Sequence, residues 1–344
     1  MVMEEMFDNW DAPTPLPDLE KELKAMRANL RRRTWKTVLT SVVLVIAILF
    51  AAVRYGIPAL ESRYWDPTVC TYLDDVTDLE LTMATYTELF GHGKHFGTVN
   101  IQKQGFAAYT LETAFLEWKN MHSLTDVSFR SATLDRGQTS LPINFWPDAE
   151  PGFMIRSLSD YEDLIQRENE QTRTLLNTLP EYIQILASVT FTKDQTMNQL
   201  CELRHTNTST TRFLWAVLRN DPELDYYSRL GVDLTFPMND RYSPSSWNTS
   251  DYPRLFMDLS WNGTYLEQHI TSMLQFSADQ FRSGTGFSPS NDDTYYQKTL
   301  AYMEENGIRA YGAYVIATPS ALLDMLEDGT VAHISLIDAQ IGLP

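Results

Sequence analysis

The side chains of this sequence that could share a chemical site are two histidines, three acid pairs and two cysteines. His92 and His95 lie three residues apart in GHGKHFG, a spacing that would let two ligands of one metal ion share a helix face. The flanking glycines favour a loop instead. A metal site needs three or four ligands, and no carboxylate or cysteine lies beside this pair. We therefore expect neither a metal nor a cofactor.

The acid pairs Asp74–Asp75, Asp292–Asp293 and Glu304–Glu305 have the spacing of solvated surface groups. The sequence contains no nucleophile elbow, P-loop, zinc-protease helix or dinucleotide fingerprint after a strand. We expect no enzymatic activity. A hydrolase whose catalytic residues are scattered along the chain is the remaining enzymatic alternative.

Cys70 and Cys201 are the two cysteines. If they pair, so long a loop would make the disulfide worth roughly 4 to 5 kcal/mol in the chain-entropy model. The alternative is two unpaired thiols, and the sequence leaves both open because it does not show their separation.

An acidic segment with aromatic residues opens the chain and precedes a helical pattern. Apolar residues then recur at spacings of three and four, which is one face of a helix with two heptads of a and d positions. This tail would dock a cytoplasmic partner, pair with a copy of itself, or lie solvated beside lipid headgroups. The candidate contact residues are Phe7, Trp10, Leu16, Leu19, Leu23, Met26 and Leu30.

Residues 37–53, TVLTSVVLVIAILFAAV, carry no charge and predict a membrane-spanning helix over 37–55. As a helix the run is about 25 Å long, and aromatic and basic residues flank it. A buried core helix would show a polar stripe, and a cleaved signal peptide would begin nearer the N-terminus. The predicted membrane-interface residues are Arg31, Arg32, Arg33, Trp35, Lys36, Arg54 and Tyr55.

Charge predicts the orientation of this span. Residues 21–36 hold seven Lys or Arg and one acid, which places the N-terminus in the cytoplasm and residues 56–344 outside. Residues 1–36 are neutral overall, so the net charge of −18 lies beyond them. Such an acidic outer region argues against nucleic-acid binding.

The outer region predicts an α+β fold of strand-helix-strand units with helices on one face of a sheet. Ser159, with Glu162 three residues later, would cap the helix predicted at 158–178. The predicted regions are a tail at 1–36, the span at 37–55, a stalk and β-rich part at 56–175 and an α+β domain at 176–344. Within them we expect a stalk at 60–90, β-rich structure at 96–160, strands at 181–192, 211–218, 308–318 and 331–337, helices at 158–178, 193–203, 264–281, 292–306 and 318–326, and a loop at 220–255.

Two stretches resemble the bacterial sigma factor regulator family: LPEYIQILASVTFTKDQTMNQL at 179–200, and GIRAYGAYVIATPSALLDMLEDGTVAHISLIDAQI at 307–341. The basic run before the span also resembles the N-terminal part of that family. The resemblance implies that the tail holds an extracytoplasmic-function sigma factor at the membrane and that the outer domain governs its release. The tail lacks the His-x3-Cys-x2-Cys of zinc-containing anti-sigma factors and is short, which points equally to a co-regulator.

These observations predict a single-pass membrane protein that regulates a sigma factor as an anti-sigma factor or its co-regulator, in response to an envelope signal. The expected partners are the sigma factor and the lipid bilayer, with an envelope ligand or a second membrane regulator as further candidates. The alternative is an extracytoplasmic ligand-binding or cell-envelope assembly module whose tail is only an anchor.

Overall fold

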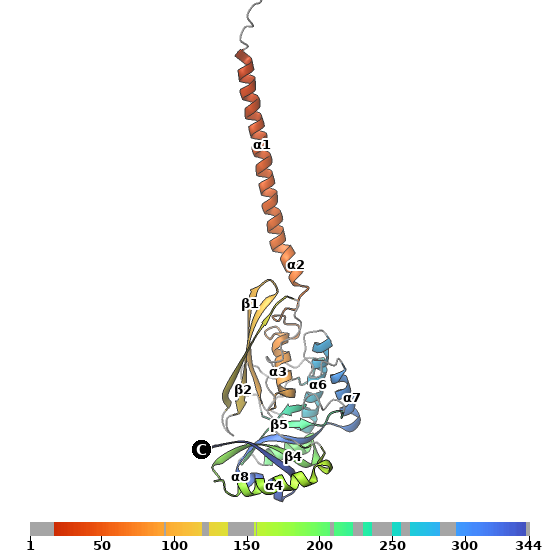
Figure 1. The fold of residues 1–344 in the computed structure, drawn as a ribbon. Helices are drawn as coiled ribbons and strands as arrows, with labels where there is room; N and C mark the ends of the chain where they lie inside the picture. Colours follow the sequence, from red (N-terminus) through yellow and green to blue (C-terminus); the bar gives the residue numbers. More distant parts are fainter. Residues whose placement is uncertain are drawn as a thin grey trace, which may run out of the picture. The chain divides into compact units, whose positions relative to one another are not determined.

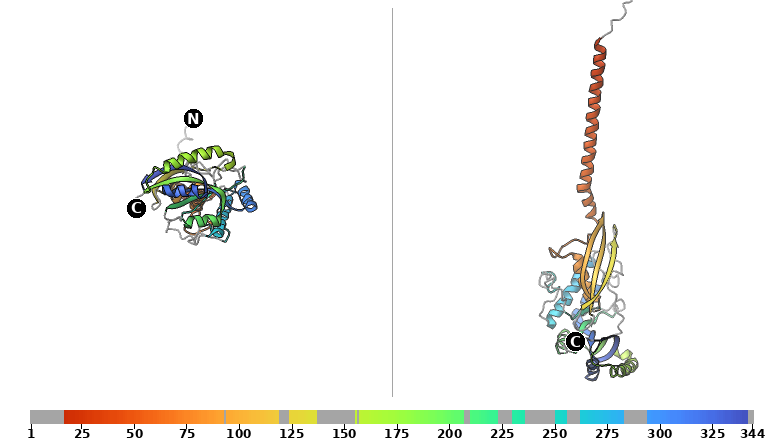
Figure 2. Two further views of the ribbon diagram at one scale, coloured as in Figure 1. Left: turned by 90° about the horizontal axis from the view of Figure 1, so that it is seen from below. Right: turned by 90° about the vertical axis from the view of Figure 1, so that its left-hand side faces the viewer.

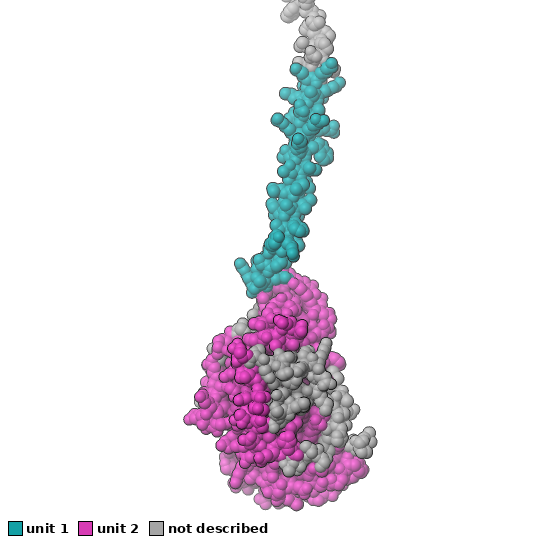
Figure 3. Space-filling view, turned by 180° about the vertical axis from the view of Figure 1, so that it is seen from behind, with its two compact units in different colours: residues 1–63 teal, residues 64–344 magenta. Residues whose placement is uncertain are grey.

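The structure is a computed structural model that describes residues 17–92, 94–118, 124–136, 155, 157–206, 210–222, 230–235, 250–255, 262–282 and 294–341. The chain forms two compact units, Met1–Arg63 and Tyr64–Pro344 (Figure 3). The second unit contains residues 64–175 of the first predicted outer region and all of the second, 176–344.

The first unit is built on one long helix. Helix α1 (Pro17–Ala51) continues through a π-helical turn over Ala52–Gly56 into the short helix α2 (Ile57–Glu61). Pro58 explains the wider turn, because its ring would clash with the carbonyl of Arg54 in a regular α-helix and it has no N–H to donate. The helix is therefore altered directly after the predicted span 37–55.

Part of the region predicted as a stalk is instead a buried helix. Helix α3 (Asp78–Phe90) begins at a capping box in which Thr77 accepts from the backbone of Glu80. Leu79 and Met83 pack in one hydrophobic cluster, and Leu89 packs in another. Because α3 is buried on two sides, its apolar residues do not form the single stripe that is typical of a surface helix. The sequence pattern therefore did not predict a helix here.

The hydrophobic cluster that contains Leu79 and Met83 also contains residues of a three-stranded antiparallel sheet. The strand order of this sheet is β1-β2-β3. The strands are β1 (His95–Gly105), β2 (Ala108–Trp118) and β3 (Leu124–Leu134), shown side by side in the right-hand view of Figure 2. A two-residue turn joins β1 to β2, with Ala107 at a positive φ of 47°. This sheet confirms β structure within the predicted stretch 96–160.

The second unit also contains a five-stranded antiparallel sheet in the order β6-β5-β7-β4-β8, of which Figure 1 labels β4 and β5. Strands β4 and β5 both pair antiparallel with β7, so helix α5 connects two parallel strands that β7 separates. Helix α8 likewise connects β7 to β8 on either side of β4. Two such interleaved units make the ferredoxin-like β-α-β-β-α-β topology. The bounds are β4 (Ile183–Thr196), α5 (Met197–Thr206), β5 (Thr211–Leu218), β6 (Gly231–Asp233), α6 (Gly263–Arg282), α7 (Tyr295–Asn306), β7 (Arg309–Ala317), α8 (Pro319–Glu327) and β8 (Val331–Ile341).

Helices on one face of this sheet share the main hydrophobic core. Leu200 of α5, Leu322 of α8 and Leu176 of helix α4 (Glu162–Leu176) all belong to it. The predicted α+β class is therefore confirmed, since the described residues form helices together with antiparallel sheets. Helix α4 also covers the edge strand β8, where Asn169 Nδ2 donates to the carbonyl of Ala332 at 2.7 Å. Such a cover protects an edge strand from pairing with another chain.

Two local predictions for this unit need correction. Ser159 does not cap α4: Tyr161 occupies the cap position without a side-chain hydrogen bond, and Ser159 lies in a short 3-10 turn. Strand β6 lies within the predicted loop 220–255 and pairs with β5 at the sheet edge. Three residues are too few to show an alternating pattern in the sequence.

Candidate functional site

The predicted contact face of the tail lies on the described part of α1. Leu23, Met26 and Leu30 are 46%, 65% and 58% exposed, and all three lie on one side of the helix by their spacing. The helix runs without a break from this face into the apolar stretch. Phe7, Trp10 and Leu16 lie outside the described residues, and the structure describes only the helical backbone at Leu19.

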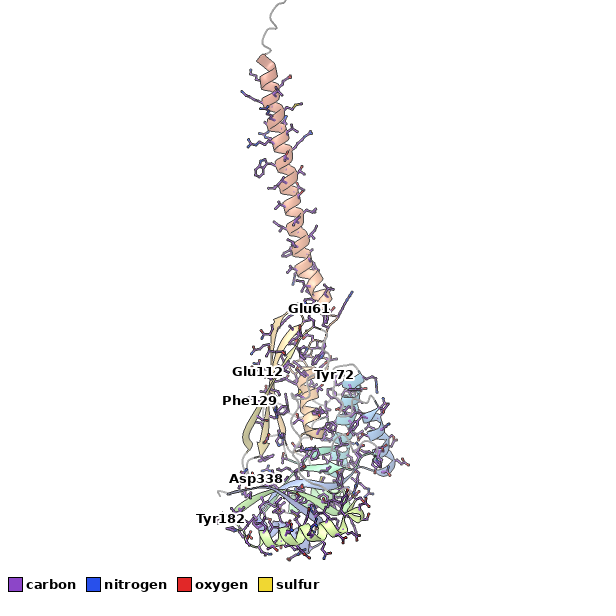
Figure 4. The ribbon with its side chains drawn as sticks, in the orientation of Figure 1. Glu61, Tyr72, Glu112, Phe129, Tyr182 and Asp338 are labelled. Carbon is purple, nitrogen blue, oxygen red and sulfur yellow. The ribbon has the colours of Figure 1, made fainter. Side chains whose placement is uncertain are left out.

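The predicted membrane-interface residues lie on α1 and on the π-helical turn that continues it. The helix over Lys21–Glu61 is long and apolar enough to cross a membrane. Its side chains project from all around the helix axis in Figure 4. Trp35 is 66% exposed and Tyr55 is 70% exposed, at the two ends of the apolar run. Arg31, Arg32, Arg33, Lys36 and Arg54 are exposed beside them.

The disulfide that the sequence left open is not formed. Cys70 and Cys201 are both free thiols. Cys70 is exposed, and its Sγ lies 3.6 Å from the carbonyl of Thr68, whereas Cys201 of α5 belongs to the main core. Burial raises the pKa of the Cys201 thiol and keeps it in its neutral form. The structure thus shows the alternative of two unpaired thiols.

His95, considered from sequence only as a metal ligand, belongs to a buried hydrogen-bond network. Its Nδ1 lies 2.7 Å from the Asp233 carboxylate, and its Nε2 lies 2.8 Å from the indole Nε1 of Trp118 and 2.9 Å from the hydroxyl of Thr235. Thr235 donates from both its backbone N–H and its hydroxyl to Asp233. These residues connect the start of β1 and the end of β2 to strand β6.

The hydrogen-bond contacts and the nearby charges together indicate which atoms of this network carry protons. An indole N–H can only donate, so Nε2 of His95 accepts and the proton of the neutral ring is on Nδ1, facing Asp233. Burial disfavours the charged imidazolium, but contact with Asp233 outweighs it and raises the pKa of His95. The guanidinium of Arg212 lies over the Trp118 ring, 3.7 Å from the ring centre, where a cation–π interaction stabilises the position of the indole.

This arrangement suits a structural connection better than catalysis. The lone pair on Nε2 that a general base or metal ligand would use is occupied by Trp118. The Thr235 hydroxyl, which a nucleophilic site would direct toward the imidazole, donates to Asp233. His92 does not join His95: its ring lies edge-on to Trp215 with centroids 4.7 Å apart. Among the described residues, no group of three or more His, Cys, Asp or Glu is placed to hold a metal ion.

Two further buried histidines pair with carboxylates that the sequence did not connect. Nε2 of His269 lies 2.6 Å from Glu88, and Nε2 of His333 lies 2.8 Å from Glu168. His269 also donates from Nδ1 to the carbonyl of Arg254 at 2.9 Å, because a carbonyl can only accept. Nδ1 therefore carries a proton, and the Glu88 carboxylate at Nε2 favours a second one, so these contacts favour the imidazolium form of His269. The sequence around a histidine does not indicate which distant carboxylate will pair with it in the folded protein.

The described residues therefore place the predicted contact face and the membrane-interface residues on one helix, and they place three histidine–carboxylate pairs inside the second unit. Comparison of the chain with models of protein families, with curated proteins and with solved structures gives no match.

Proposed function

We propose that this protein is a single-pass membrane regulator, with residues 1–36 in the cytoplasm and the second unit on the other side of the membrane. The observation that carries the proposal is the continuity of α1, because the exposed face at Leu23, Met26 and Leu30 and the apolar stretch belong to one helix. Residues 21–36 hold seven basic residues, which favours a cytoplasmic N-terminus.

The proposed partner is a sigma factor that the tail holds at the membrane. Support comes from the two stretches that resemble sigma factor regulators. In the fold they form β4 and β7-α8-β8, which are neighbours in one sheet. The tail offers two contact surfaces: the acidic segment with Phe7 and Trp10, and the Leu and Met face of α1. A signal received by the second unit would free the partner, either through a change in how the tail is presented or through cleavage near the span.

The alternative function is an envelope-side binding or assembly module that uses the tail only as an anchor. The two functions differ in what the tail does. A regulator loses its cytoplasmic partner when the contact residues change, whereas an anchor works with any tail of the same charge and length.

The deciding experiment is a pull-down from detergent extract, with bound proteins identified by mass spectrometry. The bait is the intact chain or a chain lacking residues 1–30. The shortened chain keeps the basic residues Arg31, Arg32, Arg33 and Lys36, which favour membrane insertion with a cytoplasmic N-terminus. A point variant, Phe7→Ala with Trp10→Ala, is compared with the control Asn9→Ala with Thr14→Ala. We expect a sigma factor with the intact chain and the control, and its loss with the deletion and the aromatic variant. Envelope proteins retained equally by every bait, with no transcription protein, would contradict the regulator and favour the anchor.

A further inference from the structure

We propose that the tail of α1 pairs with the tail of a second copy of this chain as a parallel coiled coil, in which Glu22 of each copy faces Arg27 of the other. The inference rests on the proposed membrane anchorage, which holds two copies in the same direction. It also deepens the proposed function, since it assigns the Leu and Met face to the second copy and leaves the acidic, aromatic segment for the cytoplasmic partner.

The apolar positions fit a two-heptad seam. Leu23 and Leu30 are spaced by seven, as a positions are, and Leu19 and Met26 are the d positions. In the structure Leu23, Met26 and Leu30 are exposed on a regular helix. Large apolar side chains in such a row are typical of a surface that another helix covers.

The charges beside the seam indicate what covers it. Glu22 lies at a g position and Arg27 at the following e position, and both are exposed. On its own helix, Arg27 has Lys24 and Arg31 as its charged neighbours at spacings of three and four. Like charges at these spacings are unfavourable, and Arg27 has no acidic residue three or four positions away on its own helix.

A second, parallel copy supplies that opposite charge. In a parallel pair, a g residue meets the e residue five positions later on the other helix, which brings Glu22 to Arg27 twice by symmetry. Glu22 and Arg27 of one helix point in different directions, because five residues turn an α-helix by about 500°. The complementarity is therefore between copies and not within one.

The seam ends where the apolar span begins. The next d position is Arg33 and the next a position is Thr37, so the apolar a and d row stops after Leu30. Two heptads pair weakly in free solution, where short isolated helices are marginal. Anchorage of both copies in one membrane raises their effective concentration and makes so short a seam sufficient.

Cysteine cross-linking of the full chain in lipid vesicles tests the pairing. In a Cys70→Ser background, Leu23→Cys places a thiol in the seam, and the matched control Ala28→Cys places one on the opposite side of the same helix. We expect mild oxidation to give a dimer with Leu23→Cys at least about fivefold more than with Ala28→Cys. Equal yields from the two positions would mean random collision and would overturn the proposal.

Charge reversal tests the register. Glu22→Arg and Arg27→Glu, each in the Leu23→Cys chain, should lower dimer yield roughly threefold to tenfold, because two attractions become two repulsions. The double reversal should restore the yield. Failure of the double variant to recover would overturn the Glu22–Arg27 pairing. This readout needs no sigma factor, so a failed dimer and a failed pull-down are separate results.

Discussion

At the residue scale, the imidazole of His95 lies between a carboxylate that accepts from Nδ1 and an indole that donates to Nε2. The Asp233 carboxylate therefore holds the ring proton of neutral His95 on Nδ1. This leaves the lone pair of Nε2 to accept the hydrogen bond from the indole N–H of Trp118. The residues come from β1, β2 and β6, so the network joins the two sheets of the second unit. We expect its members to be energetically coupled, as residues of one buried hydrogen-bond network are.

The coupling predicts the outcome of a double-mutant cycle. Asp233→Asn presents an N–H to Nδ1, which moves the ring proton to Nε2 against the indole N–H of Trp118. We expect a loss of roughly 1–3 kcal/mol in the free energy of unfolding. Trp118→Phe removes that opposing donor, so Asp233→Asn should be less damaging in the Trp118→Phe background. Urea unfolding of the four proteins measures this, and strictly additive losses would show that the tautomer does not couple the two residues.

At the element scale, the pair formed by His269 and Glu88 joins α6 to α3. Burial disfavours the charged form of His269, but Glu88 and the carbonyl of Arg254 outweigh it and raise the pKa of His269, with Asp233 adding to the effect. The folded-state pKa thus lies above the usual value of about 6.5. The stability from this pair is fully present below about pH 6.5 and is lost as the pH rises through the folded-state pKa.

The raised pKa of His269 predicts how the stability of the protein changes with pH. Above about pH 6.5, the free energy of unfolding of the wild type should fall relative to His269→Gln, by about 1.4 kcal/mol for each unit by which the pKa is raised. Glu88→Gln should abolish the same relative change, because the imidazolium then loses its counter-charge. Thermal unfolding between pH 5.5 and 9 measures it, and a wild type that gains stability over His269→Gln on alkalinisation would contradict the assignment.

At the scale of the whole molecule, the proposed anchorage and orientation depend on α1. The proposal predicts that protease added to intact cells digests the second unit and leaves residues 1–36 protected. Changing Arg31, Arg32 and Arg33 together to Gln should lower the correctly oriented fraction, since these residues lie directly before the apolar run. Arg54→Gln, on the far side of the run, is the matched control and should leave the orientation unchanged.

The mass of the mature chain completes this test. A mature chain that keeps residues 1–36 would support the proposed anchorage by α1. A mature chain that begins after the apolar run would identify the helix as a signal sequence and would contradict both the anchorage and the pairing of tails.

Local patterns in the sequence were sufficient for much of the second unit. The strand predicted at 211–218 is β5 with the same bounds, and the helix predicted at 318–326 is α8, with Thr318 as its N-cap. Cap residues, proline and apolar alternation act over a few positions, so the sequence displays them directly. The apolar run at 37–53 belongs to the same class, because its composition and length suffice to indicate a helix able to span a membrane.

The helical N-terminal segment, the α+β class and most of the helices and strands could thus be predicted from local sequence patterns. The strand order β6-β5-β7-β4-β8, the burial of α3 between two clusters and the pairing of His95 with Asp233 could not. Strand order and ion pairs arise from contacts between residues far apart in the chain. Such contacts depend on how whole elements pack together, and no short window of sequence records that packing.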